Sequence, residues 1–236
     1  MSRLAVISGG GTGIGAAIAR SLRKDGLDVA VIGRRLEPLE SIEGAQAIQA
    51  DLRDAAALEG VKEALGDRPV DVLVNNAGGY IGRSTDDIGA IARQWRDNFE
   101  TNVITAVLLT EALLPQLRRP GGRVILFSSI AAQRGGGGPY SATKAALHGW
   151  VMDLAAQLGP EGITANVIAP GYIADTEFFG DRMTPEGHAS RVNATLVGRA
   201  GVPDDIAQTV RWLVGPSSGY VTGQIIGVNG GSVLGR

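Results

Sequence analysis

A tyrosine and a lysine four residues apart, Tyr140 and Lys144, have the types and the spacing that proton transfer requires. Residues four apart lie on one face of an α-helix, so the phenol and the ammonium can share a cleft. A free tyrosine has a pKa of about 10, and a neighbouring positive charge lowers that pKa toward the range where a proton shuttle operates. The spacing alone is not specific, because surface helices contain it by chance.

Polar and small residues that follow three apolar segments are expected beside this pair. Ser128 and Ser129 end one segment, Asn-Asn-Ala-Gly at 75–78 ends another, and Pro-Gly at 170–171 ends a third. The carboxyl ends of parallel strands meet at one edge of a sheet, where open α/β sheets bind ligands. We therefore expect these residues to lie together, with Asn102 from the following helical stretch.

The turn at 8–15, Ser-Gly-Gly-Gly-Thr-Gly-Ile-Gly, has the composition of a phosphate-binding loop. Glycines leave N–H groups exposed at a helix N-terminus and place no Cβ in the way of a phosphate. Gly11, Gly13 and Ala16 fit the dinucleotide fingerprint only in its alanine variant. An ordinary flexible loop is the alternative.

Two arginines at the end of the second apolar segment indicate which dinucleotide would bind. An NAD site has an acidic residue there for the ribose 2′-hydroxyl, whereas this chain has Arg34 and Arg35. Guanidinium groups bind phosphate by charge and by bidentate geometry, so NADP(H) is favoured, with Arg34 as the main partner of the 2′-phosphate, and NAD(H) remains possible. A solvated basic loop is the alternative. Asp51, followed by Leu52, can accept a hydrogen bond from the adenine amino group or cap the next helix.

The elements that position these residues alternate along the chain, which predicts an α/β fold. Apolar segments that are continuous, as in strands covered on both faces, alternate with helical periodicity, so we expect a single-domain, Rossmann-like, doubly wound parallel sheet of about seven strands with helices on both faces. The whole chain, 1–236, is expected to form one dinucleotide-binding catalytic domain, with 173–200 as an inserted lid over the site. The expected strands are 4–7, 28–32, 45–50, 70–74, 123–128, 163–169 and 224–228, and the expected helices are 14–24, 55–65, 88–117, 141–158 and 203–214.

Composition excludes several classes of function. The formal net charge of −2 provides no field that would attract nucleic acid. The chain has no cysteine and only two histidines, so neither disulfides nor a metal site is expected. No signal peptide and no membrane-spanning apolar run is evident, so a cytoplasmic protein is expected.

Taken in their order along the chain, the glycine turn, Asn-Asn-Ala-Gly, the serine, Tyr-x-x-x-Lys and Pro-Gly resemble the ketoreductase-like group of the short-chain dehydrogenase/reductase family. The spacing of Gly9, Gly13 and Gly15 is similar to the glycine motif of that family. Segments 198–203, 220–224 and 229–231 also look like family segments, so the resemblance covers the whole chain.

The resemblance implies a role for each matching residue. Tyr140 would be the general acid/base, and Lys144 would lower its pKa and hold the nicotinamide ribose. Ser129, or Ser128 as the alternative, would bind and polarise the substrate oxygen, and Asn102 would support the lysine through a water relay. The interval between Ser129 and Tyr140 is slightly shorter than is usual in the family, which leaves the choice of serine and the pocket entrance open.

The same resemblance implies a cofactor site, a substrate site and an assembly. The long helical stretch with Trp95 and Phe99, together with the Tyr140 helix, would form the interface of a homotetramer or homodimer. The substrate would be a small-molecule carbonyl or alcohol compound, such as a 3-oxoacyl thioester or a polyketide ketone, and a catalytically silent dinucleotide-binding regulator is the alternative function. The residues expected at the cofactor are Gly9, Gly11, Thr12, Gly13, Ile14, Gly15, Arg34, Arg35, Asp51, Leu52, Asn76, Ala77, Gly78, Tyr140, Lys144, Pro170, Gly171, Ile173 and Thr176, and those expected at the substrate are Tyr80, Gln133, Tyr172, Phe178 and Phe179.

Overall fold

The computed structural model describes residues 2–82 and 87–235, and of Asp181 only the backbone. Its centre is a sheet of parallel strands in the order β3-β2-β1-β4-β5-β6-β7. The order reverses between β1 and β4, the point where doubly wound sheets bind their ligands. The strands are β1 Leu4–Ser8, β2 Asp28–Gly33, β3 Gln46–Gln49, β4 Val72–Asn75, β5 Arg123–Phe127, β6 Thr164–Pro170 and β7 Ile225–Val228.

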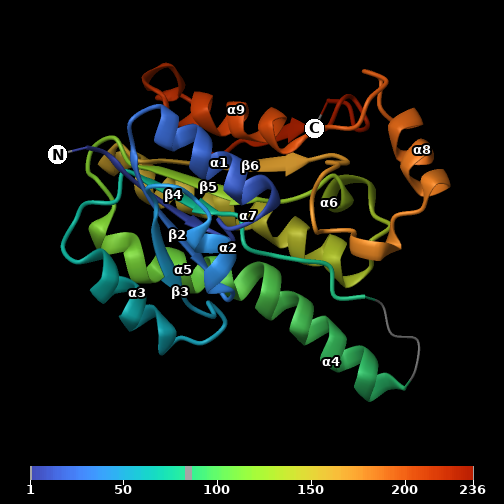
Figure 1. Ribbon diagram of the computed structural model, residues 1–236, viewed down its shortest axis with the longest axis horizontal. Coiled ribbons are helices and arrows are strands. Elements are labelled where there is room, and N and C mark those ends of the chain that lie inside the picture. The colour runs from blue at the N-terminus through green and yellow to red at the C-terminus, as the bar shows by residue number, and fades with distance from the viewer. Residues whose placement is uncertain (1, 83–86, 236) are drawn as a thin grey trace.

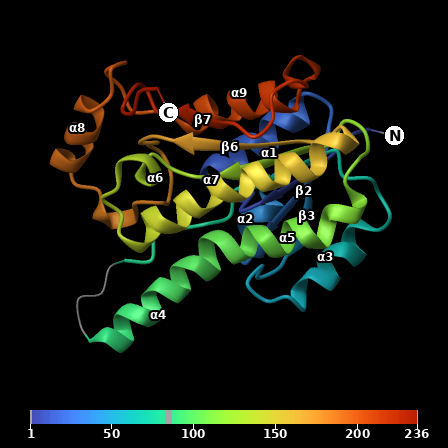
Figure 2. The ribbon, with the colours of Figure 1, turned by 180° about the vertical axis from the view of Figure 1, so that it is seen from behind.

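Helices cover both faces of this sheet, which confirms the expected fold class (Figure 1). Helices α1 and α9 pack on one face, and α3, α5 and α7 pack on the other, as the reverse view also shows (Figure 2). The helices are α1 Gly13–Lys24, α2 Leu36–Glu40, α3 Ala57–Leu65, α4 Ile88–Phe99, α5 Thr105–Leu113, α6 Ala131–Arg134, α7 Pro139–Leu158, α8 Pro185–Asn193 and α9 Pro203–Val214.

The central strands β1, β4, β5 and β6 are buried along their whole length because each one contributes to two separate cores. Side chains of a strand alternate between the faces of the sheet. In β1, Val6 joins the core beneath α3, α5 and α7, whereas Ile7 joins the core beneath α1 and α9. Both side chains are fully buried. Burial on both faces fixes the register of the strands and therefore the positions at which they end.

The expected helical stretch over 88–117 is confirmed, but it is not α-helical throughout. A π-helical turn, Glu100–Ile104, separates α4 from α5, and a 3-10 turn follows at Leu114–Gln116. A π turn adds a residue to the helical repeat and is often found at functional sites. Here it carries Asn102, which is buried. No glycine or proline marks this turn, so helical periodicity alone did not reveal it.

Three short helices and two helix starts also differ from expectation, since α3 begins at Ala57 instead of residue 55. Helices α2, α6 and α8 were not expected, since the first two are too short to show a period and the third lies in the segment interpreted as a lid. Helix α7 begins at Pro139 instead of residue 141, because proline suits the first turn of a helix.

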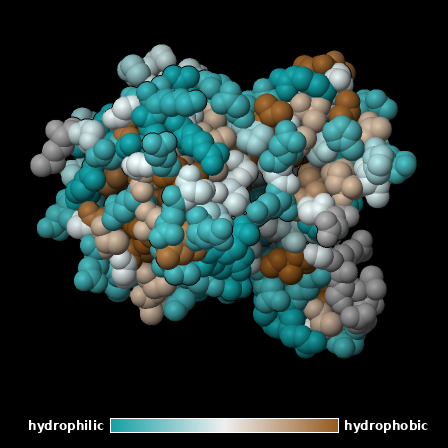
Figure 3. Space-filling view, viewed as in Figure 1, coloured by the Kyte–Doolittle hydropathy of each residue, from teal (hydrophilic) through white to brown (hydrophobic). Residues whose placement is uncertain are grey.

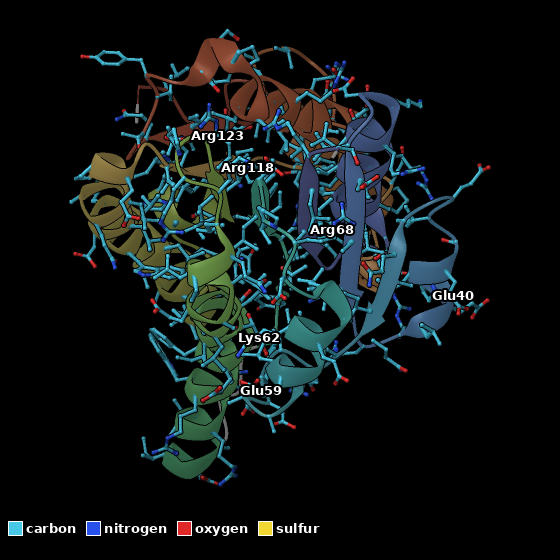
Figure 4. All side chains as sticks on the ribbon, turned by 90° about the vertical axis from the view of Figure 1, so that its left-hand side faces the viewer. Glu40, Glu59, Lys62, Arg68, Arg118 and Arg123 are labelled. Atoms are coloured by element: carbon cyan, nitrogen blue, oxygen red, sulfur yellow. The ribbon has the colours of Figure 1, made fainter. Side chains whose placement is uncertain are left out.

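Charged residues hold the amino-terminal edge of the sheet together. Asp71 is buried and accepts a 2.8 Å hydrogen bond from the Leu4 amide. Its carboxylate also pairs with Arg118, which lies near Arg123 in the side view (Figure 4). Arg123 donates to the carbonyls of Gly121 and Gly122, both at 3.0 Å. This edge is thus closed by its own contacts, and the ligand-binding residues lie at the opposite edge.

No helix among the described residues is long and apolar enough to cross a membrane.

Candidate functional site

The glycine turn between β1 and α1 has a backbone that other residues could not adopt. Gly9 has a φ of +65°, and its amide donates to the Ile32 carbonyl at 2.8 Å. A Cβ on Gly15 would lie 2.1 Å from the Gly9 carbonyl oxygen, and one on Gly9 would lie 2.9 Å from Nδ2 of Asn76. Glycine is therefore required for the close approach of the turn to α1 and to the end of β4, and not merely for flexibility.

A pocket runs from this turn along the ends of β2, β3 and β4, as expected for a dinucleotide site. It brings together residues that are far apart in the sequence. The expected residues that line it are Gly9, Gly11, Thr12, Arg34, Arg35, Asp51, Leu52, Asn76, Ala77 and Gly78, and the residues not foreseen are Ile32, Gly33, Pro38, Leu39, Ala50, Arg53, Thr101, Thr105 and Glu177.

Nine other residues expected at the cofactor do not line this pocket: Gly13, Ile14, Gly15, Tyr140, Lys144, Pro170, Gly171, Ile173 and Thr176. Some of them still connect the segment after β6 to the glycine turn. A Cβ on Gly13 would lie 3.4 Å from Cγ2 of Thr176. Ile173 is buried, and its carbonyl accepts a 3.4 Å hydrogen bond from the Thr176 hydroxyl.

Three arginines line the pocket, and two of them have carboxylate partners. Arg35 pairs with Glu177 at 2.6 Å, and Arg53 pairs with Asp51 at 2.5 Å. The hydrogen bond from Arg53 lowers the pKa of Asp51 to about 2. Within the described parts of the chain, the Arg34 guanidinium has neither an ion pair nor a hydrogen bond. Arg34 is therefore the pocket arginine that is most available to a phosphate.

The sequence places charged residues near the expected contact residues, but it does not pair Arg35 with Glu177. Arg53 follows Asp51 by two residues, and Glu177 follows Thr176 directly. The only signal in the sequence was that Arg53 and Glu177 are charged and stand next to residues expected at the cofactor. The Arg35–Glu177 pair joins positions 142 residues apart, which no local pattern reveals.

Tyr140 and Ser129 form the centre of the second part of the site. The Tyr140 side chain is only 8% exposed, and Ser129 makes a side-chain hydrogen bond with its hydroxyl. The alternative residue, Ser128, is bound elsewhere, since its hydroxyl donates to the Lys144 carbonyl at 2.9 Å and contacts Nε2 of His148 at 2.8 Å. The structure thus brings Ser129, and not Ser128, to the tyrosine.

Lys144 and Asn102 meet beside the loop that follows β4. The Lys144 ammonium donates to the Phe127 carbonyl at 2.8 Å. The Asn102 amide donates to the Gly79 carbonyl at 2.9 Å and accepts from the Gly79 amide at 3.0 Å. A Cβ on Gly78 would lie 2.7 Å from Oδ1 of Asn102 and 3.0 Å from Nζ of Lys144. The π turn, the loop after β4 and α7 therefore converge at one point.

Burial controls the acidity of this pair. It raises the pKa of Tyr140 to about 12, and the hydrogen bond with Ser129 opposes this rise. Burial also lowers the pKa of Lys144 to about 8. The expected lowering of the tyrosine pKa by the lysine is not found, because the Lys144 ammonium lies 5.8 Å from the ring centroid and binds a carbonyl. At neutral pH the tyrosine is protonated and the lysine is charged.

A continuous row of aromatic rings, the aromatic row, borders Tyr140. It consists of Tyr80, Tyr140, Phe178, Phe179 and Tyr172, with centroids of successive rings 5.9, 5.6, 5.0 and 5.4 Å apart. Four of the five residues expected at the substrate thus lie together around Tyr140. The fifth, Gln133, lies half-buried in α6.

Within the described ranges, no group of three or more His, Cys, Asp or Glu side chains could hold a metal ion.

Comparison with known proteins finds a family model and relatives that match nearly the whole chain. A family model described as enoyl-(acyl carrier protein) reductase matches residues 9–232. The chain is 36% identical to the short-chain reductase protein NovJ of Streptomyces niveus, over 97% of this chain and 93% of that protein.

A second relative and a solved structure are also similar to nearly the whole chain. The chain is 34% identical to the 3-oxoacyl-[acyl-carrier-protein] reductase FabG of Haemophilus influenzae, with 98% of each chain covered. Its fold matches the crystal structure of a variant of actinorhodin polyketide ketoreductase with NADPH, with a TM-score of 0.86 and 31% identity, over 98% of this chain and 97% of that one.

Proposed function

Because the chain belongs to the short-chain dehydrogenase/reductase family, we propose that it is an NADP(H)-dependent oxidoreductase that reduces a ketone to an alcohol. The observation that carries the proposal is the convergence of Tyr140, Ser129 and Lys144 at the carboxyl edge of the sheet, beside the dinucleotide pocket.

The pocket has the features that a phosphorylated dinucleotide requires. The glycine turn keeps side chains away from the N-terminus of α1, where a pyrophosphate is stabilised by backbone N–H groups and the helix dipole. Arg34, and Arg35 if it leaves Glu177, would bind the 2′-phosphate. The solved structure of the polyketide ketoreductase variant contains NADPH, which supports the same cofactor here. When bound, NADPH supplies a hydride to the carbonyl carbon of the substrate.

The side chains of the protein would handle the proton and the charge. The Ser129 hydroxyl donates a hydrogen bond to the substrate carbonyl oxygen and polarises it. Tyr140, protonated at neutral pH because its pKa is about 12, donates its proton to that oxygen as negative charge develops there. Once it leaves the Phe127 carbonyl and approaches the phenol oxygen, the Lys144 ammonium would stabilise the phenolate that remains. A protonated tyrosine is the form required for reduction, which together with NADPH favours that direction.

Asn102 would act as a positioning residue. Its side chain binds both backbone groups of Gly79 and thereby fixes the loop that faces Lys144. This contact supports the lysine without a direct bond to the reacting atoms. The water relay implied by the family remains a proposal for this chain.

The segment 173–200 would act as the lid of a catalytic domain that spans 1–236. It lines the dinucleotide pocket through Glu177 and covers the Tyr140 ring with Phe178. Adjacent residues of one segment thus contact both parts of the site. Closing such a segment excludes water from the reaction.

We further propose a homotetramer or homodimer in the cytoplasm, where NADPH is regenerated. Trp95 on α4 is 42% exposed, and Met152 on α7 is 56% exposed. Large apolar side chains on neighbouring helices favour burial against a second copy. Analytical ultracentrifugation tests the assembly, since a monomer at micromolar concentration contradicts it.

The function is tested by NADPH consumption over a panel of ketones, with the alcohol product identified by mass spectrometry. The wild-type protein should reduce at least one ketone, and the Tyr140→Phe variant should bind NADPH but lose turnover. A protein that binds NADPH but reduces no ketone would be the silent regulator, and no contact in the described residues favours that alternative.

A further inference from the structure

The aromatic row has a positively charged group stacked on it near each end. The Arg182 guanidinium lies 5.1 Å from the centroid of the Tyr80 ring. The Arg191 guanidinium lies 5.1 Å from the centroid of Phe179 and 6.0 Å from that of Tyr172. Stacked guanidinium groups are held by the rings while their edges stay free for hydrogen bonds.

The two guanidinium groups are also held by backbone carbonyls instead of by carboxylates. Nε of Arg182 donates to the Phe179 carbonyl at 3.0 Å, and a second nitrogen of Arg182 donates to the Phe178 carbonyl. Arg191 donates to the Gly187 carbonyl at 3.0 Å. Neither arginine has an ion-pair partner in the part of the chain that the structure describes. Each therefore keeps its positive charge and several N–H donors for a ligand.

The position of Arg182 relative to the proton donor defines what could bind. The Tyr80 ring lies between the charge and the phenol ring of Tyr140. Its centroid is 5.1 Å from the Arg182 guanidinium and 5.9 Å from the centroid of the Tyr140 ring. This is the scale of one aromatic ring with its substituents. Arg182 lies on the 3-10 turn Gly180–Arg182 and is exposed, so a ligand can reach it. At the upper right of Figure 3, hydrophobic residues reach the surface around α8, the helix that follows this turn.

Phe178 indicates what kind of group the phenol ring accepts. Its ring lies 5.6 Å from Tyr140 with an interplanar angle of 52°, although 37% of the residue is exposed. A planar ring of a substrate would make the same tilted contact, which is worth more than burial of an aliphatic chain of equal area.

From these contacts, and resting on the proposed ketone reduction, we propose that the lid selects planar aromatic ketones that carry an anionic group. The ring of the substrate stacks in the aromatic row with its carbonyl at Tyr140, and its carboxylate or phenolate binds Arg182 at the near end. Arg191 at the far end provides a second cationic position for longer substrates.

The test compares matched ketones with NADPH: para-acetylbenzoate, its neutral methyl ester, and the aliphatic pair acetoacetate and methyl acetoacetate. We expect kcat/KM for para-acetylbenzoate to exceed that for its ester by roughly tenfold, as a charge-assisted hydrogen bond would give. Equal values for acid and ester overturn the charged contact. Acetoacetate reduced as well as para-acetylbenzoate overturns the aromatic selection.

Variants of Arg182 distinguish the effect of its positive charge from an effect on the conformation of the lid. Arg182→Gln should remove the preference for para-acetylbenzoate while leaving the methyl ester within about twofold, and Arg182→Lys should restore part of the preference. The control Arg20→Gln, an exposed arginine of α1, should change neither substrate. A loss of acid and ester in equal measure would assign Arg182 to lid folding alone and overturn the proposal.

Binding measurements keep this inference distinct from the proposed reaction. Isothermal titration of the NADPH-loaded protein should give a lower Kd for para-acetylbenzoate than for its ester, whether or not turnover occurs. Turnover of neutral ketones without any preference for the acid leaves the reductase intact and refutes the anion site. If the protein binds para-acetylbenzoate more tightly than its ester but reduces no ketone, the proposed reductase activity is refuted and the anion site is supported.

Discussion

Replacement of Arg34 tests the cofactor assignment most directly. Of the arginines that line the dinucleotide pocket, Arg35 is paired with Glu177 and Arg53 with Asp51, whereas Arg34 has no carboxylate partner in the described residues. Binding of a 2′-phosphate by Arg34 therefore costs no existing ion pair. The Arg34→Gln substitution removes the positive charge without introducing repulsion.

The expected magnitude follows from the exposure of this side chain. Hydrogen bonds to charged groups contribute about 1.5–3 kcal/mol, and solvent screening at an exposed site favours the lower value. An effect of about 1.5 kcal/mol is roughly a tenfold rise in Kd for NADPH. NADH lacks the 2′-phosphate, so its Kd should change by less than about twofold.

Fluorescence titration of NADPH and NADH into both proteins measures these constants, and the effect on NADPH should shrink at high salt. Arg35→Gln is the matched control, since Arg35 is engaged by Glu177 and its loss should weaken NADPH binding less. Equal weakening of NADPH and NADH by Arg34→Gln would refute the assignment, as would a larger effect of Arg35→Gln.

Three further perturbations follow from the geometry. Tyr140→Phe keeps the ring and removes only the hydroxyl, so steady-state kinetics should give a kcat about 10²- to 10⁴-fold lower with an unchanged Kd for NADPH, and near-normal turnover contradicts the mechanism. Gly15→Ala places a Cβ 2.1 Å from the Gly9 carbonyl oxygen, so titration should show at least about tenfold weaker NADPH binding, whereas Gly60→Ala on α3, with nothing within 4 Å of its Cβ, should leave binding unchanged. Burial lowers the pKa of Lys144 from 10.5 to about 8, so between these values the unfolded state binds more protons and the free energy of unfolding rises with pH. Urea denaturation from pH 8 to 10 should show this rise in the wild type and lose it in Lys144→Met, and an identical slope in both would contradict the burial argument.

The order of elements and the identity of the reacting groups could be predicted from the sequence because both depend on local patterns. Continuous apolar runs such as 29–32 are typical of strands covered on both faces, and the structure confirms the predicted parallel sheet. Tyr140 and Lys144 could be paired in advance since a separation of four residues on a helix determines their common face. The glycines of the turn were identifiable because their role depends on the absence of a side chain.

Only the tertiary structure decided how these groups act, since their partners come from distant parts of the chain. Ser128 and Ser129 are chemically identical neighbours, and only the packing of α7 against β5 shows that Ser129 contacts Tyr140. The π turn that carries Asn102 is likewise invisible to helical periodicity.

The same reason applies to the charges at both ends of the site. The pKa of Tyr140 depends on its burial and not on its distance in sequence from Lys144, so the expected direction of the shift was wrong. Arg34 differs from Arg35 because Glu177, which lies 142 residues after Arg35 in the chain, pairs with Arg35. The sequence by itself determined which groups could react, and the fold determined which of them meet, because desolvation and long-range pairing exist only once the chain has packed.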